Sequence, residues 1–520
     1  MNFKFNRKIL FILLFFFLLN SFFFVTNDNN IKISFQHKSE IDNYTPRIAD
    51  ESDIFSSLSH ELPHFSNANF SMLHQIENDT ILAHNSPFTQ TITVTIFCVD
   101  FPNKAHTLTG QEVEERFNSA TLNDLRDYWS ELSKDHLILN FDIHDWYTAP
   151  NNVEYYATEG YYQGYYIPDR RLLDLVEEVY DYYDDTVDFS NYIFQDLAGN
   201  TRSYIGFILP GWCESFGQIY SGDTSDREFW SCKWANYIDL DGITVNNFFI
   251  TSEFPNSPGI ATHEFGHMLG LPDLYDLTGV GTGVGEWCLM GYGGGLGYIN
   301  NDIDTFGTTP GHLCAWSKIK FGWADTQTLR VAIEAEQVEI DAFNPNEPYF
   351  PRIYKILRYT NEIEYFLLEA RFQTIQSFDY YIADEGLLIL HVDEDNQQTL
   401  EGGYMVDVEE NEETQELEDQ TLENYGDEDD CWDEGDIFSS TSNPNSNWYG
   451  GTDSKVTIEV ISIDPDERII VRITAPKPPE PPIVNSFPIV ILLTISFAAI
   501  TVVLKNTNVK SKKKSHSKKC

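Results

Sequence analysis

The stretch "ATHEFGHMLGLPDLYD" (residues 261–276) decides how the rest of the chain is interpreted. It places a glutamate directly after the first of two histidines that stand four positions apart, His263 and His267. Residues at this spacing lie on one face of a helix, so both imidazoles can point at one ion. The pattern is typical of a zinc-dependent hydrolase site, with Glu264 as the general base.

The residues on either side of this stretch favour a helix of the right length. Ser257 suits the N-cap position, Pro258 suits the first helical position, and Gly270 is able to take the left-handed conformation that ends a helix. Because the chain can turn at Gly270, Asp273 is placed to return toward the ion. We therefore predict Asp273 as the third zinc ligand.

A second His-Glu-x-x-His pattern lies in "SHELPHF" (residues 59–65). Pro63 separates His60 from His64, and a proline inside a helix removes a backbone hydrogen bond and clashes with the preceding turn. The two histidines are therefore not expected to share a helix face. We interpret this second match, including Glu61, as a coincidence.

A glycine-rich segment, "GEWCLMGYGGGLGY" (residues 285–298), follows the zinc motif. Met290 in such a turn can lie beneath a metal site, although a lone methionine is more often core filler. The zinc motif and this turn together resemble a metzincin, whose extended zinc helix is followed by a Met-turn. Tyr292 resembles the tyrosine that some metzincins use near the transition state. The alternative is that Tyr292 only packs in the turn.

The run from His263 to Asp276 is similar in particular to the immune inhibitor A family of secreted metallopeptidases. Similar stretches along residues 90–475 are "LRDYWSELS", "WSCKW", "TPGHLCAWSKIKFGW", "EYFLLEARF" and "GLLILHVDE". The resemblance implies a zinc endopeptidase that acts on protein or peptide substrates. It also implies that Zn²⁺ activates a water molecule from which Glu264 takes the proton.

The strand and helix patterns predict two folded regions. Residues 90–328 alternate between strands and helices, which indicates an α+β, metzincin-like peptidase domain with a mixed twisted sheet and an active-site helix. In this domain "TGQEVEERFNSATLNDLRDYWSELS" (109–133) is expected to form one helix that ends near Ser133, and "VNNFFITSEF" (245–254) is expected to form an edge strand. Residues 329–475 contain short alternating strands, which predict an all-β, sandwich-like domain.

Both ends of the chain carry apolar segments. A basic start followed by an apolar run predicts a signal peptide or N-terminal anchor, and an apolar stretch of about 20 residues near the other end is long enough to cross a bilayer. The lysines beyond it favour the cytoplasmic side. We thus expect a single-pass cell-membrane protein with an extracellular catalytic region and a lipid-bilayer contact through its C-terminal helix. The predicted segments are 1–26 (signal or anchor), 27–89 (propeptide or stalk), 476–482 (proline-rich spacer), 483–504 (transmembrane helix) and 505–520 (basic cytoplasmic tail).

Charge narrows the choice of partners. The formal net charge of the chain is -48, which argues against nucleic acid because phosphate contacts need a basic surface. The loop at residues 401–436 is especially acidic. Its simplest interpretation is a solvated acidic loop, and ligation of Ca²⁺ by part of it is the alternative.

The chain contains seven cysteines. Of the seven cysteines, six fall in the part expected to be exported, where disulfides are allowed, but their number does not give the pairing. Cys213 and Cys232 flank one loop and are a candidate pair.

A cell-surface binding or adhesion protein with a degenerate peptidase domain is an alternative function, and the intact Glu264 argues against it. A zinc hydrolase of another substrate class is a further alternative.

Overall fold

The computed structural model describes residues 86–475, apart from 120–123, 158–159, 163–164, 168–170, 213–228, 230, 299–304, 330–332, 359–361, 376, 401–402, 412–414, 420–423 and 465–466. The predicted signal segment, propeptide, spacer, transmembrane helix and basic tail lie outside these residues, as do the His60/His64 motif and Cys213. Within the described part of the chain, no helix is long and apolar enough to cross a membrane.

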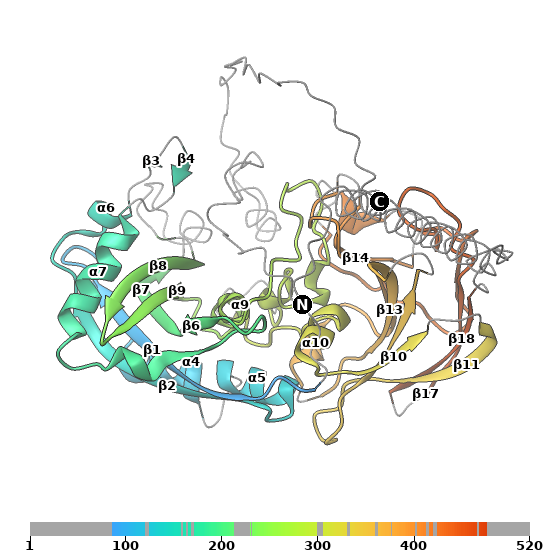
Figure 1. Ribbon diagram of the computed structural model, residues 1–520, viewed down its shortest axis with the longest axis horizontal. Helices are drawn as coiled ribbons and strands as arrows, with labels where there is room; N and C mark the ends of the chain where they lie inside the picture. The colour runs from blue at the N-terminus through green and yellow to red at the C-terminus, as the bar shows by residue number, and fades with distance from the viewer. Residues whose placement is uncertain are drawn as a thin grey trace, which may run out of the picture. The chain divides into compact units, whose positions relative to one another are not determined.

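The first half of the described chain forms a five-stranded sheet in the order β2-β1-β7-β9-β8 (Figure 1). Neighbouring strands are parallel except β8, which runs antiparallel to β9. The strands are β1 (Gln90–Asp100), β2 (Leu137–Thr148), β7 (Ile205–Trp212), β8 (Cys232–Leu240) and β9 (Ile243–Phe254). The predicted mixed sheet is therefore present.

Alternation along β1 divides its side chains between two hydrophobic cores, because successive strand residues face opposite sides of a sheet. Ile92, Val94 and Ile96 pack with residues of α4 (Gly110–Asn118), α5 (Leu125–Ser133) and α9 (Gly259–Met268). Phe97 and Val99 pack instead with residues of α7 (Leu172–Tyr183). The sheet is thus covered by helices on both faces.

Two local predictions in this region are wrong. The segment 109–133 forms two helices, α4 and α5, rather than one. Asp124 begins the second helix by accepting a hydrogen bond from the Asp127 N–H, as N-cap residues do. Residues 245–254 belong to β9, which lies inside the sheet between β7 and β8 instead of at its edge.

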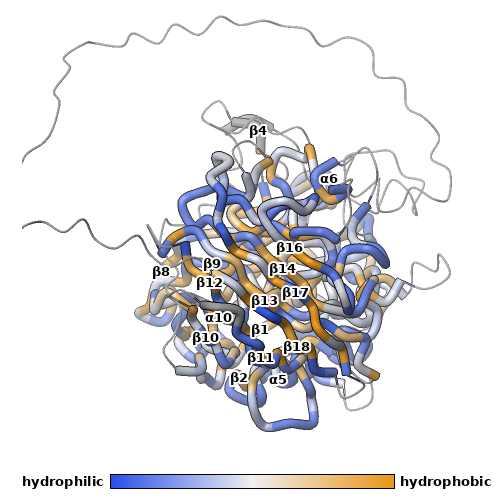
Figure 2. The backbone as a smooth tube through the Cα atoms, turned by 90° about the vertical axis from the view of Figure 1, so that its right-hand side faces the viewer, coloured by the Kyte–Doolittle hydropathy of each residue, from blue (hydrophilic) through white to orange (hydrophobic). Residues whose placement is uncertain are grey.

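The second half is β-rich, as predicted, and forms two sheets with the orders β10-β12-β13-β14-β15 and β11-β18-β17-β16. Residues of both sheets share one hydrophobic core. Figure 2 shows the hydrophobic stretches of β13 and β14 next to those of β17. The strands are β10 (Asp325–Leu329), β11 (Ile333–Asp341), β12 (Arg352–Leu357), β13 (Glu364–Arg371), β14 (Gly386–Asp393), β15 (Val406–Val408), β16 (Ile437–Ser439), β17 (Thr457–Asp464) and β18 (Arg468–Ala475).

Short elements connect these sheets. In the described segments, the other helices and strands are α6 (Val153–Tyr156), β3 (Gly160–Tyr162), β4 (Tyr165–Ile167), β5 (Ile193–Gln195), β6 (Thr201–Ser203) and α10 (Ala315–Phe321). Single 3₁₀ turns occupy Phe189–Tyr192, Gly285–Trp287, Gly293–Gly295, Phe378–Tyr381 and Glu416–Glu418.

Buried polar contacts join the two predicted domains. Lys318 on α10 forms an ion pair of 2.5 Å with Glu369 on β13, and both side chains are buried. One hydrophobic core also contains residues from both sides of the predicted boundary at 328/329, such as Trp323 and Leu388. The boundary itself stays a prediction, but the two regions share an interior.

Candidate metal centre

The ligand helix α9 begins at Gly259 and ends at Met268. Pro258 occupies the N-cap position and Ser257 makes no capping hydrogen bond, so the predicted Ser257 cap is wrong. Gly270 has a φ of 102°, the left-handed conformation expected after the helix. The chain turns there, and the Leu271 N–H donates to the Gly266 carbonyl oxygen at 3.0 Å.

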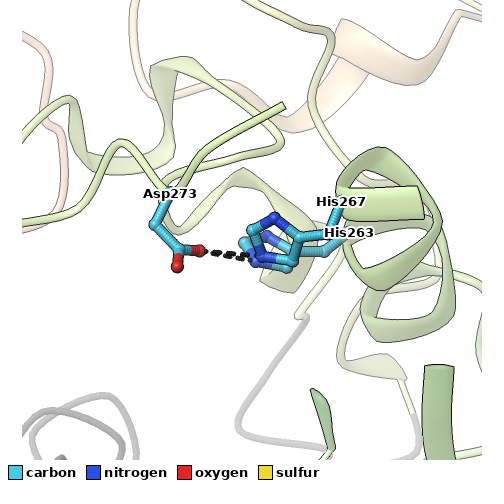
Figure 3. A group of neighbouring side chains, drawn as sticks. All are labelled: His263, His267 and Asp273. Atoms are coloured by element: carbon cyan, nitrogen blue, oxygen red, sulfur yellow. Dashed lines mark hydrogen bonds and ion pairs between the residues drawn. The ribbon is translucent and has the colours of Figure 1, made fainter. Parts of the chain in front are cut away.

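The three predicted ligand residues converge on one point (Figure 3). The Nε2 atoms of His263 and His267 lie 3.1 and 3.0 Å from the same oxygen of Asp273, Oδ1. One ligand atom from each residue lies within 4.8 Å of the others. Two imidazole nitrogens and a carboxylate oxygen form a donor set that suits Zn²⁺ and leaves room for a fourth ligand.

The opposite nitrogen of each histidine is held by a backbone carbonyl. His263 Nδ1 lies 2.8 Å from the Leu289 oxygen, and His267 Nδ1 lies 2.8 Å from the Leu271 oxygen. A carbonyl oxygen can only accept, so each Nδ1 carries a proton and donates. Each Nε2 then faces the point that it shares with Asp273 Oδ1, which is the usual second-shell arrangement of a metal-binding histidine.

The electrostatics of the cluster favour positive charge at this point. Burial lowers the pKa of His263, but the hydrogen bond and negative charge of Asp273 outweigh it and raise that pKa to about 9. Glu264 follows His263 on α9 and is buried, and its Oε2 has no hydrogen-bond partner. The donor set and this unpartnered carboxylate oxygen both fit a zinc ion with an attached water.

Met290 packs against α9, and its assignment to a Met-turn stays a prediction. Its side chain is fully buried, and its carbonyl oxygen accepts from the Leu274 N–H at 2.7 Å. A Cβ atom placed on Gly266 would lie 2.5 Å from the Met290 sulfur. The close approach explains why glycine stands directly before His267.

Two tyrosines lie beside the ligands, and the sequence pointed to only one of them. Tyr292, the predicted residue, packs on Tyr275 and Tyr425, with ring centroids 5.9 and 4.6 Å apart. Tyr275 lies closer to the metal ligands, because its ring stacks on His263 at 6.4 Å and its hydroxyl hydrogen bonds to Asp273. Burial, together with the charge of Asp273, raises the pKa of Tyr275 and keeps its hydroxyl protonated. The sequence signal that could have identified Tyr275 is its position two residues after the predicted ligand Asp273.

The loop that carries Asp273 is held by the β-rich region. The buried Gln398 side chain donates to the Leu274 carbonyl oxygen at 2.9 Å, and its backbone oxygen accepts from the Leu277 N–H at 2.9 Å. The hydroxyl of Tyr404 donates to Asp276 at 2.9 Å. Asp276 is therefore occupied as a loop anchor, outside the three-residue ligand group.

Part of the acidic loop 401–436 is buried, so the interpretation of this loop as solvated is wrong for that part. Asp430 is fully buried and accepts from the Trp287 indole N–H at 2.7 Å. Glu410 is fully buried and accepts from the Leu417 N–H at 3.0 Å. These carboxylates are buried because they receive hydrogen bonds. Within the described residues the candidate metal group found is His263, His267 and Asp273, and the Ca²⁺ hypothesis stays a prediction.

Comparisons with known proteins agree with this geometry. The family model for the immune inhibitor A peptidase M6 catalytic domain matches residues 216–324, which include the whole ligand group and Met290. The chain is also 26% identical, over 271 residues, to the pre-pro-metalloprotease PrtV of two strains of Vibrio cholerae serotype O1. This match covers 46% of the chain and 28% of the relative. The predicted resemblance is thus confirmed: the chain is similar to the immune inhibitor A metallopeptidases through its catalytic domain.

Proposed function

We propose that the protein is a zinc endopeptidase whose ion is held by His263, His267 and Asp273. The single observation that carries this proposal is the convergence of these three side chains beside the buried, unpartnered Oε2 of Glu264. The likeness to metalloproteases supports peptide bonds as the target. When bound, Zn²⁺ supplies Lewis acidity that polarises a carbonyl group and makes water easier to deprotonate.

Glu264 is the proposed general base. Burial raises its pKa, while the neighbouring His267 and His263 oppose the rise. A carboxylate with an elevated pKa is a better proton acceptor near neutral pH than an exposed one. Its unpartnered Oε2 would take a proton from the attacking water and later deliver it to the leaving amine.

Tyr275 and Tyr292 have different proposed roles. Tyr275 donates a hydrogen bond to Asp273 and so orients a ligand carboxylate. The ring of Tyr292 is half-buried and packs on Tyr275, so Tyr275 lies between Tyr292 and the proposed ligand Asp273. We assign to Tyr275 the role of positioning Asp273. We assign to Tyr292 the role of contacting a bound substrate.

The substrates we propose are proteins or peptides outside the cell. Export and membrane attachment rest on the apolar segments at residues 1–26 and 483–504. Protease added to intact cells should remove the catalytic region and leave a small fragment that contains the basic tail, 505–520. A C-terminal tag that antibody reaches on unbroken cells would contradict this orientation.

The enzymatic proposal is tested with Glu264→Gln in the full chain. We expect the variant to bind one zinc ion, to keep its thermal midpoint, and to lose cleavage of a denatured protein substrate. Glu115→Gln, at an exposed glutamate of α4, is the matched control and should cleave normally. Normal cleavage by a zinc-loaded Glu264→Gln variant would overturn the assignment of the base. Chelator-resistant cleavage by the unmodified chain would overturn the zinc requirement.

A further inference from the structure

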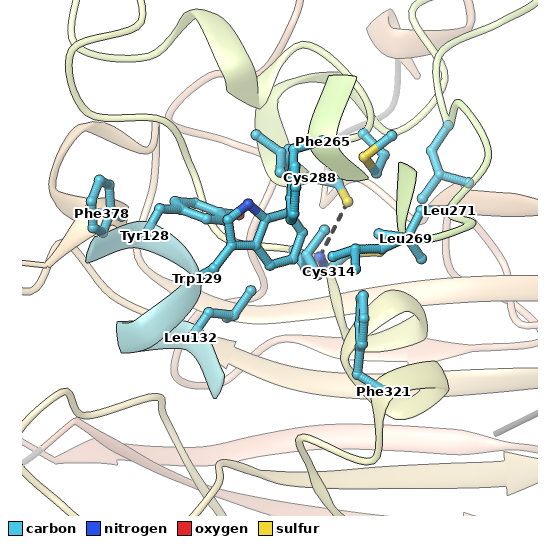
Figure 4. Close-up of a cluster of buried hydrophobic side chains, with 14 of the residues drawn as sticks. Tyr128, Trp129, Leu132, Phe265, Leu269, Leu271, Cys288, Cys314, Phe321 and Phe378 are labelled. Carbon is cyan, nitrogen blue, oxygen red and sulfur yellow. Dashed lines mark hydrogen bonds between the residues drawn. The ribbon is translucent and has the colours of Figure 1, made fainter. Parts of the chain in front are cut away.

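Two buried cysteines lie in contact beside the Met-turn, and the proposed peptidase chemistry does not use them. Cys288 and Cys314 are both free thiols with no exposed surface. The Cys314 N–H donates to the Cys288 sulfur at 3.3 Å (Figure 4), and the two thiols also hydrogen bond to each other. The Ser317 hydroxyl lies 4.0 Å from one sulfur and 3.8 Å from the other.

The backbone holds the two cysteines in this relation. The Leu289 N–H donates to the His312 carbonyl oxygen at 3.1 Å, so the segments that carry Cys288 and Cys314 run next to each other. The sulfur of Cys288 therefore already lies against the Cys314 residue. A disulfide would bring the two sulfurs to the bonded distance of about 2.05 Å.

The surroundings of the pair are apolar. Trp129, Phe265 and Phe321 belong to the same core (Figure 4). Hydrogen bonds from Cys314 outweigh the effect of burial and lower the pKa of Cys288 to about 7. Thiolates are the attacking species in thiol–disulfide exchange, so Cys288 is the better nucleophile of the two.

We propose that Cys288 and Cys314 form a disulfide when the chain folds in an oxidising compartment. The Cys288 thiolate attacks a disulfide oxidant, such as oxidised glutathione or an exchange-active protein disulfide, and displaces one thiolate. Cys314 then loses its proton and attacks the mixed disulfide. One S–S bond forms in the protein, one breaks in the oxidant, and two thiols are released in total. The reaction does not depend on peptide hydrolysis by the chain.

The bond would fasten the Met-turn to the start of α10. Cys288 precedes Leu289, whose carbonyl oxygen accepts from the ligand His263, and Met290, whose sulfur lies under Gly266. Cys314 directly precedes α10. A covalent link here limits how far the segment beneath the ligand helix can separate from the core. The cross-linked pair would therefore stabilise the proposed metal centre.

The bond itself is tested by mass spectrometry on the full chain. The chain is taken as purified from an oxidising compartment, and also after reduction and refolding with oxidised glutathione. Free thiols are then alkylated in denaturant without reductant. We expect a peptide that links Cys288 to Cys314 and disappears on reduction, while Cys98, a buried cysteine of the same core, is alkylated as the control. Complete alkylation of Cys288 and Cys314 in both preparations would overturn the proposal.

The role at the metal centre has its own readout. Zinc transfer to a chelator is followed for chain refolded with oxidised glutathione and for chain refolded with a thiol reductant. We expect the oxidised form to lose zinc several-fold more slowly, because the cross-link restricts opening of the metal centre. It should also unfold at a higher temperature, because the cross-link lowers the conformational entropy of the unfolded chain. Cys314→Ser should behave as the reduced form under both conditions. Equal rates of zinc loss in oxidised and reduced chain would show that the bond does not support the centre.

Discussion

The sulfur of Met290 lies directly against Gly266, the residue that precedes the proposed ligand His267 on α9. A Cβ atom at Gly266 would approach the sulfur to 2.5 Å and the Met290 methyl carbon to 3.3 Å, and real Cβ atoms do not come so close to a sulfur. The ligand helix and the Met-turn are therefore packed to the limit that glycine allows. Any added atom has to move the helix, the methionine or both.

Gly266→Ala should destabilise the protein and loosen the metal centre. Overpacking of a tight core costs about 1–3 kcal/mol, and here the displaced residues adjoin a ligand. Thermal unfolding and zinc content after dialysis measure the two effects. Gly266→Ala combined with Met290→Ala removes the obstructing sulfur and should recover zinc binding in part. A Gly266→Ala chain with unchanged midpoint and zinc content would contradict the packing argument.

Asp273→Asn should weaken zinc binding by at least about tenfold. The substitution keeps the shape of the side chain but removes the negative charge of one of three protein ligands. Competition with a chromophoric chelator measures the zinc affinity. Asp239→Asn, on the edge strand β8, is a control for loss of one negative charge elsewhere. Equal affinities in wild type and Asp273→Asn would place the third ligand elsewhere.

The two tyrosines can be separated by their effects on metal and on turnover. Tyr275→Phe removes the hydrogen bond to Asp273 but keeps the ring on His263, so zinc affinity should fall by about tenfold. Tyr292→Phe should leave zinc affinity unchanged and lower kcat with little change in KM. The reverse pattern, with zinc affinity lost only in Tyr292→Phe, would exchange their roles.

The local parts of the centre could be predicted from sequence because they depend on short-range geometry. His263 and His267 share a face by helical spacing alone, and Gly270 lets the chain return at Asp273. The same holds for β13 and β14, whose apolar runs coincide with the observed strands.

Other features depend on partners far away along the chain. Gln398 and Tyr404 reach the ligand loop from more than a hundred positions away, and no local pattern states which distant backbone groups they will meet. β9 was misplaced at the sheet edge, although most of its residues are buried. A long apolar run indicates a strand that is covered on both faces. The run in β9 therefore favours a position inside the sheet.

Gln398→Ala should test whether the β-rich region holds the ligand loop. The Gln398 side chain donates to Leu274 and Val406 carbonyl oxygens and accepts from the Val406 N–H, all in the interior. Leaving buried backbone groups unpaired costs about 1–3 kcal/mol, so stability and zinc retention should both decrease. Gln397→Ala, at the exposed neighbour, is the matched control. Lost stability with normal zinc retention would limit Gln398 to a structural role.

His312 is fully buried between two carboxylates. Its Nε2 lies 2.9 Å from Glu131 and its Nδ1 lies 3.1 Å from Asp379, which is also bound by Arg371. Burial lowers the pKa of His312, but Asp379 and Glu131 outweigh burial and raise it above its usual value. The imidazole is therefore protonated in the folded chain at pH values where it is neutral in the unfolded chain.

A raised histidine pKa stabilises the folded chain most at low pH. The contribution is complete below about pH 6.5, the usual value for histidine, and it is lost as the pH rises through the higher folded-state pKa. Urea unfolding from about pH 6 to pH 9 should therefore show a free-energy difference between the parent chain and His312→Gln that shrinks as the pH increases. Both chains should carry Glu264→Gln to prevent self-cleavage, which also makes zinc effects common to the pair. A difference that stays constant across this range would mean that His312 is not charged in the folded protein.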